Sequence, residues 1–348
     1  MSAYTHKRIA GLSLVELMVA IVISSVLLLG ISSVYLSSRR SNTVQDALAR
    51  LQENGRFAIS SMTKDIRMAG YQGCTNIEYL TPSNIVAGSG GGTDATYNVL
   101  NNTYITGHTC SSGSCSPAAP AGITPLSGTD AITIQSAAGC SATLTGNMGV
   151  ANANIQMQLN SCGFQANDVL FITDCQNADV FRANNVNNGS IQVIAHSNSV
   201  NTSNFLSKAY DQRARVMSYG RHTFYIANGA NGGPSLFRGD YKTDTDTVTP
   251  VELVEDVDNM TILYGVDQDK DATKSVDTFL TATQVEAKNL WSQVQTVELH
   301  LLLSTKQNAA KSLTPYRYMG VMVTPSNTSD RRYRREFTIS INIRNKTP

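Results

Sequence analysis

Three acidic side chains at alternate positions, Asp267, Asp269 and Asp271, are the clearest candidate metal ligands in the sequence. They follow a predicted strand, and alternate carboxylates in a loop can converge their oxygen atoms on Ca²⁺. The run departs from the EF-hand template, because Ala272 stands where that template needs glycine and Lys270 dilutes the charge. We therefore expect either a calcium site or a solvated acidic loop, and the sequence requires no other cofactor.

Six cysteines form the second group that could do chemistry. Their even number and the lack of paired CxxC spacing favour disulfides over a zinc site or a catalytic thiol. Cys110 and Cys115 are close enough in a loop rich in Gly and Ser to bridge each other, while the other pairings stay open. The candidates are Cys74, Cys110, Cys115, Cys140, Cys162 and Cys175. Disulfides indicate an oxidising compartment.

A basic cluster near the C-terminus surrounds Tyr333 with Arg331, Arg332, Arg334 and Arg335. Guanidiniums around an aromatic ring can grip nucleic-acid phosphates or stack a base. However, a short cluster that leads into a strand is more often a solvated or partner-facing edge. The net charge of +1 adds no overall attraction, so a nucleic-acid partner is not expected.

Motifs of catalysis are missing from the sequence. It contains no Gly-x-Ser-x-Gly or His-Glu-x-x-His, and its five histidines are scattered without ligand spacing. We therefore expect no enzyme and no catalytic residues.

Composition limits the class of protein that must position these residues. The chain has 348 residues, of which 41% are hydrophobic and 15% charged, well below the roughly 25% charge usual in soluble domains. These values exclude a disordered tail and a polytopic membrane protein, and they favour one or two globular domains outside the cytoplasm.

One apolar run, from Leu12 to Leu36, dominates the N-terminal region, and Glu16 is its single charge. The uncharged residues from Leu17 to Ser38 would cover about 33 Å as a helix, which matches the hydrocarbon core of a bilayer. The run is too long for an ordinary cleaved signal. We expect a membrane-spanning segment at about residues 15–38, with the N-terminus in the cytoplasm and the body in the periplasm.

A single helix is predicted over residues 12–70. No proline occurs from Leu12 to Ala69, and apolar residues recur at the three- and four-residue spacing of one helix face. Its second half must pack on the body, and Gly70 is a plausible C-cap. Gly30 and Gly55 lie inside this helix, where they are either tolerated or mark sites of bending.

Residues 71–348 are predicted to form an exported, disulfide-containing, antiparallel β-rich head, with two sheets or a subdomain. Loops are expected at 88–93 and 106–125, as surface excursions. The segment 297–301 alternates apolar and polar residues and predicts a half-buried strand. Strands are predicted at 131–135, 169–173, 190–195, 222–227, 261–266, 297–304 and 337–343.

The string from Gly11 to Leu17, with basic residues before it and an apolar helix after it, resembles the class III signal of type IV prepilins and pseudopilins. In that family a prepilin peptidase cuts after the glycine, methylates the new N-terminus and leaves a glutamate as the fifth mature residue. Gly11, Leu12 and Glu16 match these positions, although leucine replaces the more frequent phenylalanine at the first mature residue. The resemblance implies a leader over residues 1–11.

Further segments resemble the PilW-type minor pilins of type IV pilus assembly, most strongly over about the first 75 residues. The matching segments are 35–41, 51–57, 65–74, the region around Asp174-Cys175, 263–267 and the stretch from Arg334 to Asn345. The resemblance implies an α+β fold in which a long N-terminal helix, membrane-spanning in its first half, packs on an antiparallel β-sheet pilin-like head.

The function expected from this resemblance is that of a minor pilin that primes or caps a type IV pilus. Its expected partners are other minor pilins, the major pilin, prepilin peptidase and the inner membrane, and Glu16 would meet the freed amine of Leu12 on an adjacent subunit. The nearest alternative is a minor pseudopilin of type II secretion. A signal-anchored periplasmic binding protein or adhesin is the alternative from another class.

Overall fold

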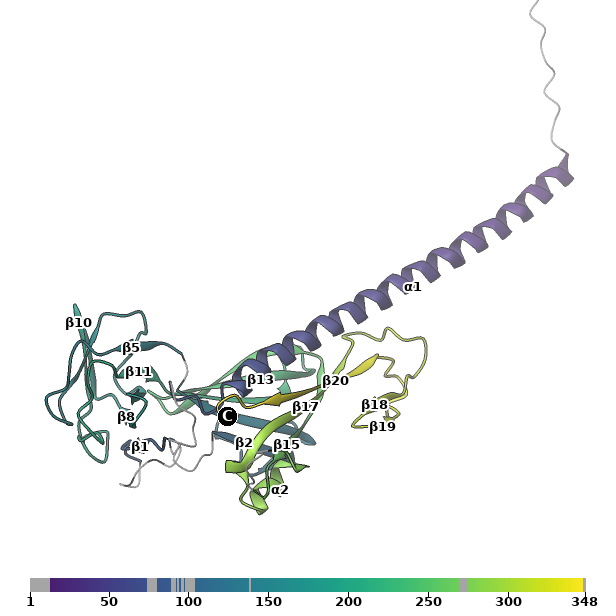
Figure 1. Ribbon diagram of the computed structural model, residues 1–348. Coiled ribbons are helices and arrows are strands. Elements are labelled where there is room, and N and C mark those ends of the chain that lie inside the picture. Colours follow the sequence, from purple (N-terminus) through teal and green to yellow (C-terminus); the bar gives the residue numbers. More distant parts are fainter. Residues whose placement is uncertain are drawn as a thin grey trace, which may run out of the picture.

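A single long helix leaves the β-rich head at one side and runs well beyond it (Figure 1). The computed structural model describes residues 13–73, 80–88, 92, 94, 97, 104–137, 139–269 and 275–346. The helix α1 covers Leu14–Arg67, and its 54 residues give a rod of about 81 Å. Together with the antiparallel sheets of the head, this helix confirms the predicted α+β class.

The end of α1 is closed by the C-terminal tail of the chain as well as by its own cap. Met68 is the C-cap, and its amide donates to the Lys64 carbonyl at 3.3 Å. The amide of Arg344 donates to the Arg67 carbonyl at 3.2 Å, and the last carbonyls are thereby satisfied inside the head. The prediction of Gly70 as the C-cap was wrong, because this glycine lies two residues beyond the cap and takes a φ of +69° in the turn that follows.

Two antiparallel sheets form the main body beneath the second half of α1. The larger sheet has the order β14-β13-β12-β4-β2-β3, and the smaller has the order β16-β15-β17-β20. The strands of the larger sheet are β2 (Ile105–Ser111), β3 (Ser114–Ser116), β4 (Thr129–Ser136), β12 (Gly220–Asn228), β13 (Pro234–Lys242) and β14 (Thr247–Glu255). Those of the smaller are β15 (Val257–Val266), β16 (Thr278–Leu280), β17 (Val294–Ser304) and β20 (Arg334–Asn342).

A second lobe lies at the end of the body away from the free end of α1 (Figure 1). It contains a five-stranded sheet, in the order β1-β8-β7-β11-β5, and a three-stranded sheet, in the order β6-β10-β9. Its own apolar core includes Phe164, Phe181 and Tyr210, all buried. The strands are β1 (Ser83–Asn84), β5 (Ser141–Thr143), β6 (Ile155–Gln158), β7 (Val169–Thr173), β8 (Ala178–Arg182), β9 (Asn185–Asn188), β10 (Ile191–Ala195) and β11 (Arg215–Ser218).

Three smaller elements lie in the connections between strands of the smaller sheet. The helix α2 (Ala282–Ala287) and a 3₁₀ turn (Trp291–Gln293) connect β16 to β17. The hairpin of β18 (Tyr316–Tyr318) and β19 (Val321–Val323) lies within the long connection between β17 and β20.

Gly55 is required by the contact between α1 and β20. A Cβ built on Gly55 would lie 2.5 Å from Cζ of Phe337, so the ring packs directly on the helix backbone. Gly30 has no neighbour within 4 Å and lies on the part of α1 that extends beyond the head. The expectation that a glycine is simply tolerated in this helix fits Gly30. Gly55 is explained by close packing instead, which neither expectation included.

Two local predictions need correction. The surface loop expected at 106–125 contains most of β2 and all of β3, because β2 pairs with β4 and β3 pairs with β2. The strand expected to be half-buried at 297–301 is buried more fully than that. Val297, Leu299 and Leu301 belong to the core that also contains residues of α1 and of the larger sheet, and His300, on the opposite face, is buried beside Tyr318 of the β18–β19 hairpin. Glu298 and His300 tolerate this position because their side chains hydrogen-bond to each other at 2.8 Å.

Candidate functional site

The first turn of α1 carries a capping box that uses the predicted site residue Glu16. The Ser13 hydroxyl accepts a hydrogen bond from the Glu16 amide at 3.2 Å, and Glu16 Oε2 accepts one from the Ser13 amide at 2.9 Å. Two amides at the start of the helix are therefore satisfied by side chains. The spacing Ser-x-x-Glu before an apolar run is the usual sequence pattern of this box, so the sequence alone could have indicated it.

The predicted cleavage residues Gly11 and Leu12 lie outside the described residues. Ser13 is the first residue that the structure describes, and it takes the extended conformation of an N-cap. The helix therefore begins two residues after the expected cleavage point, so the mature chain would keep the whole of α1.

Every described residue from Ser13 to Thr43 is exposed, including the large apolar side chains. Leu14 is 75% exposed, Leu29 is 72% exposed and Leu36 is 62% exposed. Among the described residues, α1 is the one helix long and apolar enough to cross a bilayer. An apolar surface of this size on a single helix needs lipid or neighbouring helices to cover it.

The second half of α1 is anchored in the core of the head. Its buried residues Leu51, Ala58, Met62 and Ile66 recur at the spacing of one helix face and pack with residues of both sheets. The same helix therefore has one half fixed by the head and one half available for assembly.

The disulfides lie in the head. Cys110 and Cys115 are bonded across the β2–β3 hairpin, as the sequence indicated, and Cys140 is bonded to Cys162. Cys175 is also disulfide-bonded, while Cys74 lies outside the described residues. Disulfides in three places fit a body folded in an oxidising compartment.

Two residues of the predicted acidic triplet, Asp267 and Asp269, lie just after β15, and the structure adds the carboxylate of Asp277. Single oxygen atoms of Asp267, Asp269 and Asp277 lie within 4.8 Å of one another, while Asp271 lies outside the described residues. Asp267 is buried, and Asp277 Oδ2 accepts a hydrogen bond from the Gln268 amide at 2.7 Å. These oxygens could ligate a cation, and the calcium site stays a prediction.

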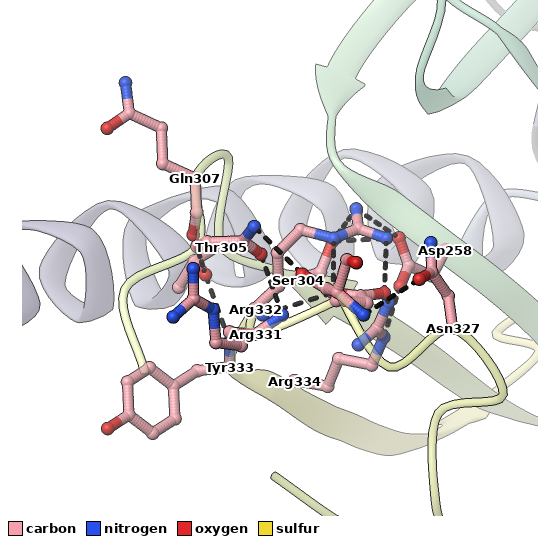
Figure 2. Close-up of polar contacts among 12 residues, drawn as sticks. Asp258, Ser304, Thr305, Gln307, Asn327, Arg331, Arg332, Tyr333 and Arg334 are labelled. Carbon is pink, nitrogen blue, oxygen red and sulfur yellow. Dashed lines mark hydrogen bonds and ion pairs between the residues drawn. The ribbon is translucent and has the colours of Figure 1, made fainter. Parts of the chain in front are cut away.

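Two of the four arginines in the predicted basic cluster form ion pairs within the head, as Figure 2 shows. Arg334 Nε contacts Asp258 Oδ2 at 2.7 Å, and Arg332 Nε contacts Asp330 Oδ1 at 3.1 Å. Burial alone would raise the pKa of Asp330, but the hydrogen bonds from Arg332 and Arg334 lower it well below its usual range. Only part of the cluster can meet a partner, and the expectation that nucleic acid is not that partner stays a prediction.

A polar cluster that sequence reasoning missed joins the β18–β19 hairpin to the smaller sheet. His300 Nδ1 lies 2.7 Å from Glu336 Oε1, and that oxygen accepts the Met319 amide at 3.2 Å. The Tyr318 hydroxyl donates to Thr261 Oγ1 at 2.8 Å. No sequence pattern could indicate it, because these residues come from four separate strands and a turn.

Comparison with known proteins gives two matches to family models. Residues 223–345 match the family described as type IV pilus-assembly protein W, and residues 6–32 match the prokaryotic N-terminal methylation motif. The resemblance to the PilW-type minor pilins is thereby confirmed over residues 223–345, and the resemblance to the prepilin signal is confirmed over residues 6–32. Neither matching model describes an enzyme.

Among solved structures, a type IV-like pilin from Thermus thermophilus matches with a TM-score of 0.35 and 10% identity, covering 86% of this chain and 98% of the other. No curated protein matches the sequence closely enough to count as a relative.

Proposed function

We propose that this chain is a minor pilin that primes the assembly of a type IV pilus or caps it. The observation that carries the proposal is the division of α1, whose apolar first half is wholly exposed while its second half is fixed in the core of the head. The matches to a pilus-assembly family and to the methylation motif support the same role.

Processing comes first in the proposed mechanism. Prepilin peptidase would remove the leader, residues 1–11, by cutting after Gly11 and would methylate the new amine of Leu12. The match to the methylation motif spans both residues and Glu16. The mature protein would stay in the inner membrane through α1, with its head in the periplasm.

Assembly then exchanges one apolar environment for another. Lipid covers the first half of α1 before assembly, and helices of neighbouring minor pilins and of the major pilin cover it afterwards, so the apolar surface is never transferred to water. Glu16 is exposed at the start of this surface, and an ionised carboxylate there needs a positive partner in the filament. The freed amine of Leu12 on an adjacent subunit would supply that charge.

A position at the tip fits the shape of the head. The second lobe lies at the end of the molecule away from the free end of α1 (Figure 1), so it would extend beyond the helical core of a filament. The role is structural, and the proposal assigns no catalytic residue.

Pilus counts and tip labelling test this role. Deletion of the gene should lower the number of pili per cell, and an epitope tag at the exposed Gly189 should be found by immunogold at pilus ends. Normal piliation after deletion would contradict the proposal. Copurification of the tagged chain with a secretion complex would favour the pseudopilin instead.

A further inference from the structure

Two arginines stand directly after the apolar part of α1, on the side of the membrane that the proposed function assigns to the head. Arg39 and Arg40 are both exposed. Cations on the exported side oppose the usual excess of positive charge on the cytoplasmic side. At this level of the helix, the two exposed cations are accessible to an anionic partner.

The head brings further positive charge to the same level of the helix. A cavity of about 700 Å³ lies between α1 and the connection that follows β17, and Arg39, Arg40, Lys311 and Arg331 all line it. We call this cavity the collar cavity. On its helix side it is also lined by Leu36, which lies at the end of the apolar surface. None of the residues that line it is acidic.

Hydrogen bonds hold together the backbone segments that carry the two head cations. The amide of Arg331 donates to Asn308 Oδ1 at 2.8 Å, and the amide of Ala310 donates to the carbonyl of Arg331 at 2.9 Å. These bonds join the two segments that carry Lys311 and Arg331. The neighbouring Arg332 and Arg334 are taken up by Asp258 and Asp330 (Figure 2), so this ion-pair network fixes the chain next to Arg331.

Nearby carboxylates are paired elsewhere. Asp46, which follows Arg40 on α1, contacts Arg50 at 3.2 Å. Glu255 contacts Lys306 at 2.7 Å. Within the part of the chain that the structure describes, no carboxylate lies within salt-bridge distance of the four cations of the collar cavity. Their charge is thus available to an external anion.

We propose that the collar cavity binds the headgroup of an anionic phospholipid and so holds the head against the membrane before assembly. This inference rests on the proposed membrane insertion of α1. The segment from Leu17 to Ser38 covers about 33 Å, which puts Arg39 and Arg40 at the level of the headgroups. Guanidinium groups bind phosphate through charge-assisted hydrogen bonds, and Leu36 lies where an acyl chain would begin.

Reconstituted vesicles provide the test. The full chain, with a fluorophore on Ser312→Cys, is inserted into vesicles of phosphatidylcholine alone or mixed with phosphatidylglycerol, each containing a lipid with a nitroxide quencher on its headgroup. Ser312 is exposed next to Lys311, so docking of the head brings the fluorophore to the quencher. We expect stronger quenching with phosphatidylglycerol, and a loss of this difference at high salt.

Charge reversal identifies the residues. Lys311→Glu with Arg331→Glu should lower the ratio of docked to undocked heads by at least about tenfold, since each cation near an anionic surface contributes about fivefold. The pair Lys311→Gln with Arg331→Gln should give a smaller loss in the same direction. Arg317→Glu is the matched control, because Arg317 is exposed on β18 and does not line the collar cavity.

Two results would overturn the proposal. One is equal quenching in both kinds of vesicle, and the other is an equal effect of Arg317→Glu and of the double reversal. Flotation of the same vesicles distinguishes failure of the headgroup site from failure of the proposed function. A chain that does not insert contradicts both proposals. An inserted chain whose quenching is the same in both kinds of vesicle contradicts only the headgroup site.

Discussion

Glu16 caps α1 and, in the proposed function, also supplies the charge for assembly. Its side chain closes the capping box with Ser13, and its charge is the only one from Leu14 to Ser38. Glutamine can also complete a capping box, because its amide oxygen accepts the same hydrogen bond. Charge and helix capping can therefore be varied independently at this position.

Glu16→Gln should keep the helix start and lose assembly, whereas Glu16→Ala should lose both. Removing the cap costs about 1 kcal/mol of helix stability, but only the charge can pair with the Leu12 amine of a neighbour. Co-isolation with other minor pilins, together with the helix content of the purified chain by circular dichroism, distinguishes the two effects. Normal co-isolation of Glu16→Gln would show that the charge is not used.

His108 should make the head less stable in acid. Burial lowers the pKa of His108 to about 4, and its Nε2 lies 2.8 Å from Thr133 Oγ1. In the unfolded chain His108 has a pKa near 6.5 and binds the proton more readily. The stability that neutral His108 contributes to the folded head is therefore complete above pH 6.5 and is lost as the pH falls to about 4. The full difference corresponds to about 3 kcal/mol.

His108→Gln should remove this part of the pH dependence. The measurement is the denaturant midpoint of each chain between pH 4 and pH 7, where the two curves should converge on the acid side. Parallel curves for the two chains would contradict the assignment.

Calcium should raise the melting temperature if Asp267, Asp269 and Asp277 hold the ion. Binding to the folded chain alone stabilises it by about 2.7 kcal/mol when calcium exceeds its Kd by a hundredfold. Asp269→Asn should abolish the rise, because it removes one of the three carboxylates while the buried Asp267 stays in place. Identical melting curves in chelator and in millimolar calcium would mean that the group is a solvated acidic loop.

At the scale of elements, the joint between α1 and β20 determines how the helix leaves the head. Phe337 packs on the backbone of α1 at Gly55, and Ile66 and Met62 continue the contact into the core. The α1–β20 joint therefore depends on a residue without a side chain.

Gly55→Ala should destabilise the head by about 1 to 3 kcal/mol, because the strain of overpacking exceeds the gain of about 1 kcal/mol from the better helix former. Adding Phe337→Leu should restore part of the loss by making room for the methyl group. Gly30→Ala is the control and should leave the melting temperature of the detergent-solubilised chain unchanged, since nothing lies within 4 Å of Gly30. A more stable Gly55→Ala would contradict the proposed close contact.

The sequence predicted the elements better than their environments. The absence of proline and the apolar spacing were enough to predict α1 to within a few residues, and 169–173 coincides with β7. Burial of β17 on both faces could not be predicted, since Glu298 and His300 carry polar groups that only the folded sheet satisfies. For the same reason the sequence could not show that Gly55 meets Phe337, a contact between residues 282 positions apart.

For the candidate site, local patterns were informative and distant contacts were not. The spacing of Cys110 and Cys115 indicated their disulfide, because a bridge within one hairpin needs only neighbouring residues. Asp277 joins Asp267 and Asp269 across a turn, and Lys311 lies near Arg39 through the fold of the head. Both depend on tertiary structure, which leaves no periodic trace in the sequence.

At the scale of the whole molecule, a rod with an exposed apolar end is joined to a head with two lobes (Figure 1). The apolar end needs lipid or other helices, and the lobes lie away from it, so membrane and filament contacts are separated from the outer surface of the head. In the proposed function, this separation would allow α1 to move from bilayer to filament without unfolding the head.

The N-terminus of the protein extracted from membranes tests the central claim most directly. Mass spectrometry should find a chain that begins at Leu12 with a methylated amine, and Gly11→Trp should retain the leader while leaving the melting temperature of the head unchanged. A wild-type protein that keeps residues 1–11, or that begins at any other position, would contradict the assignment of this chain as a processed pilin.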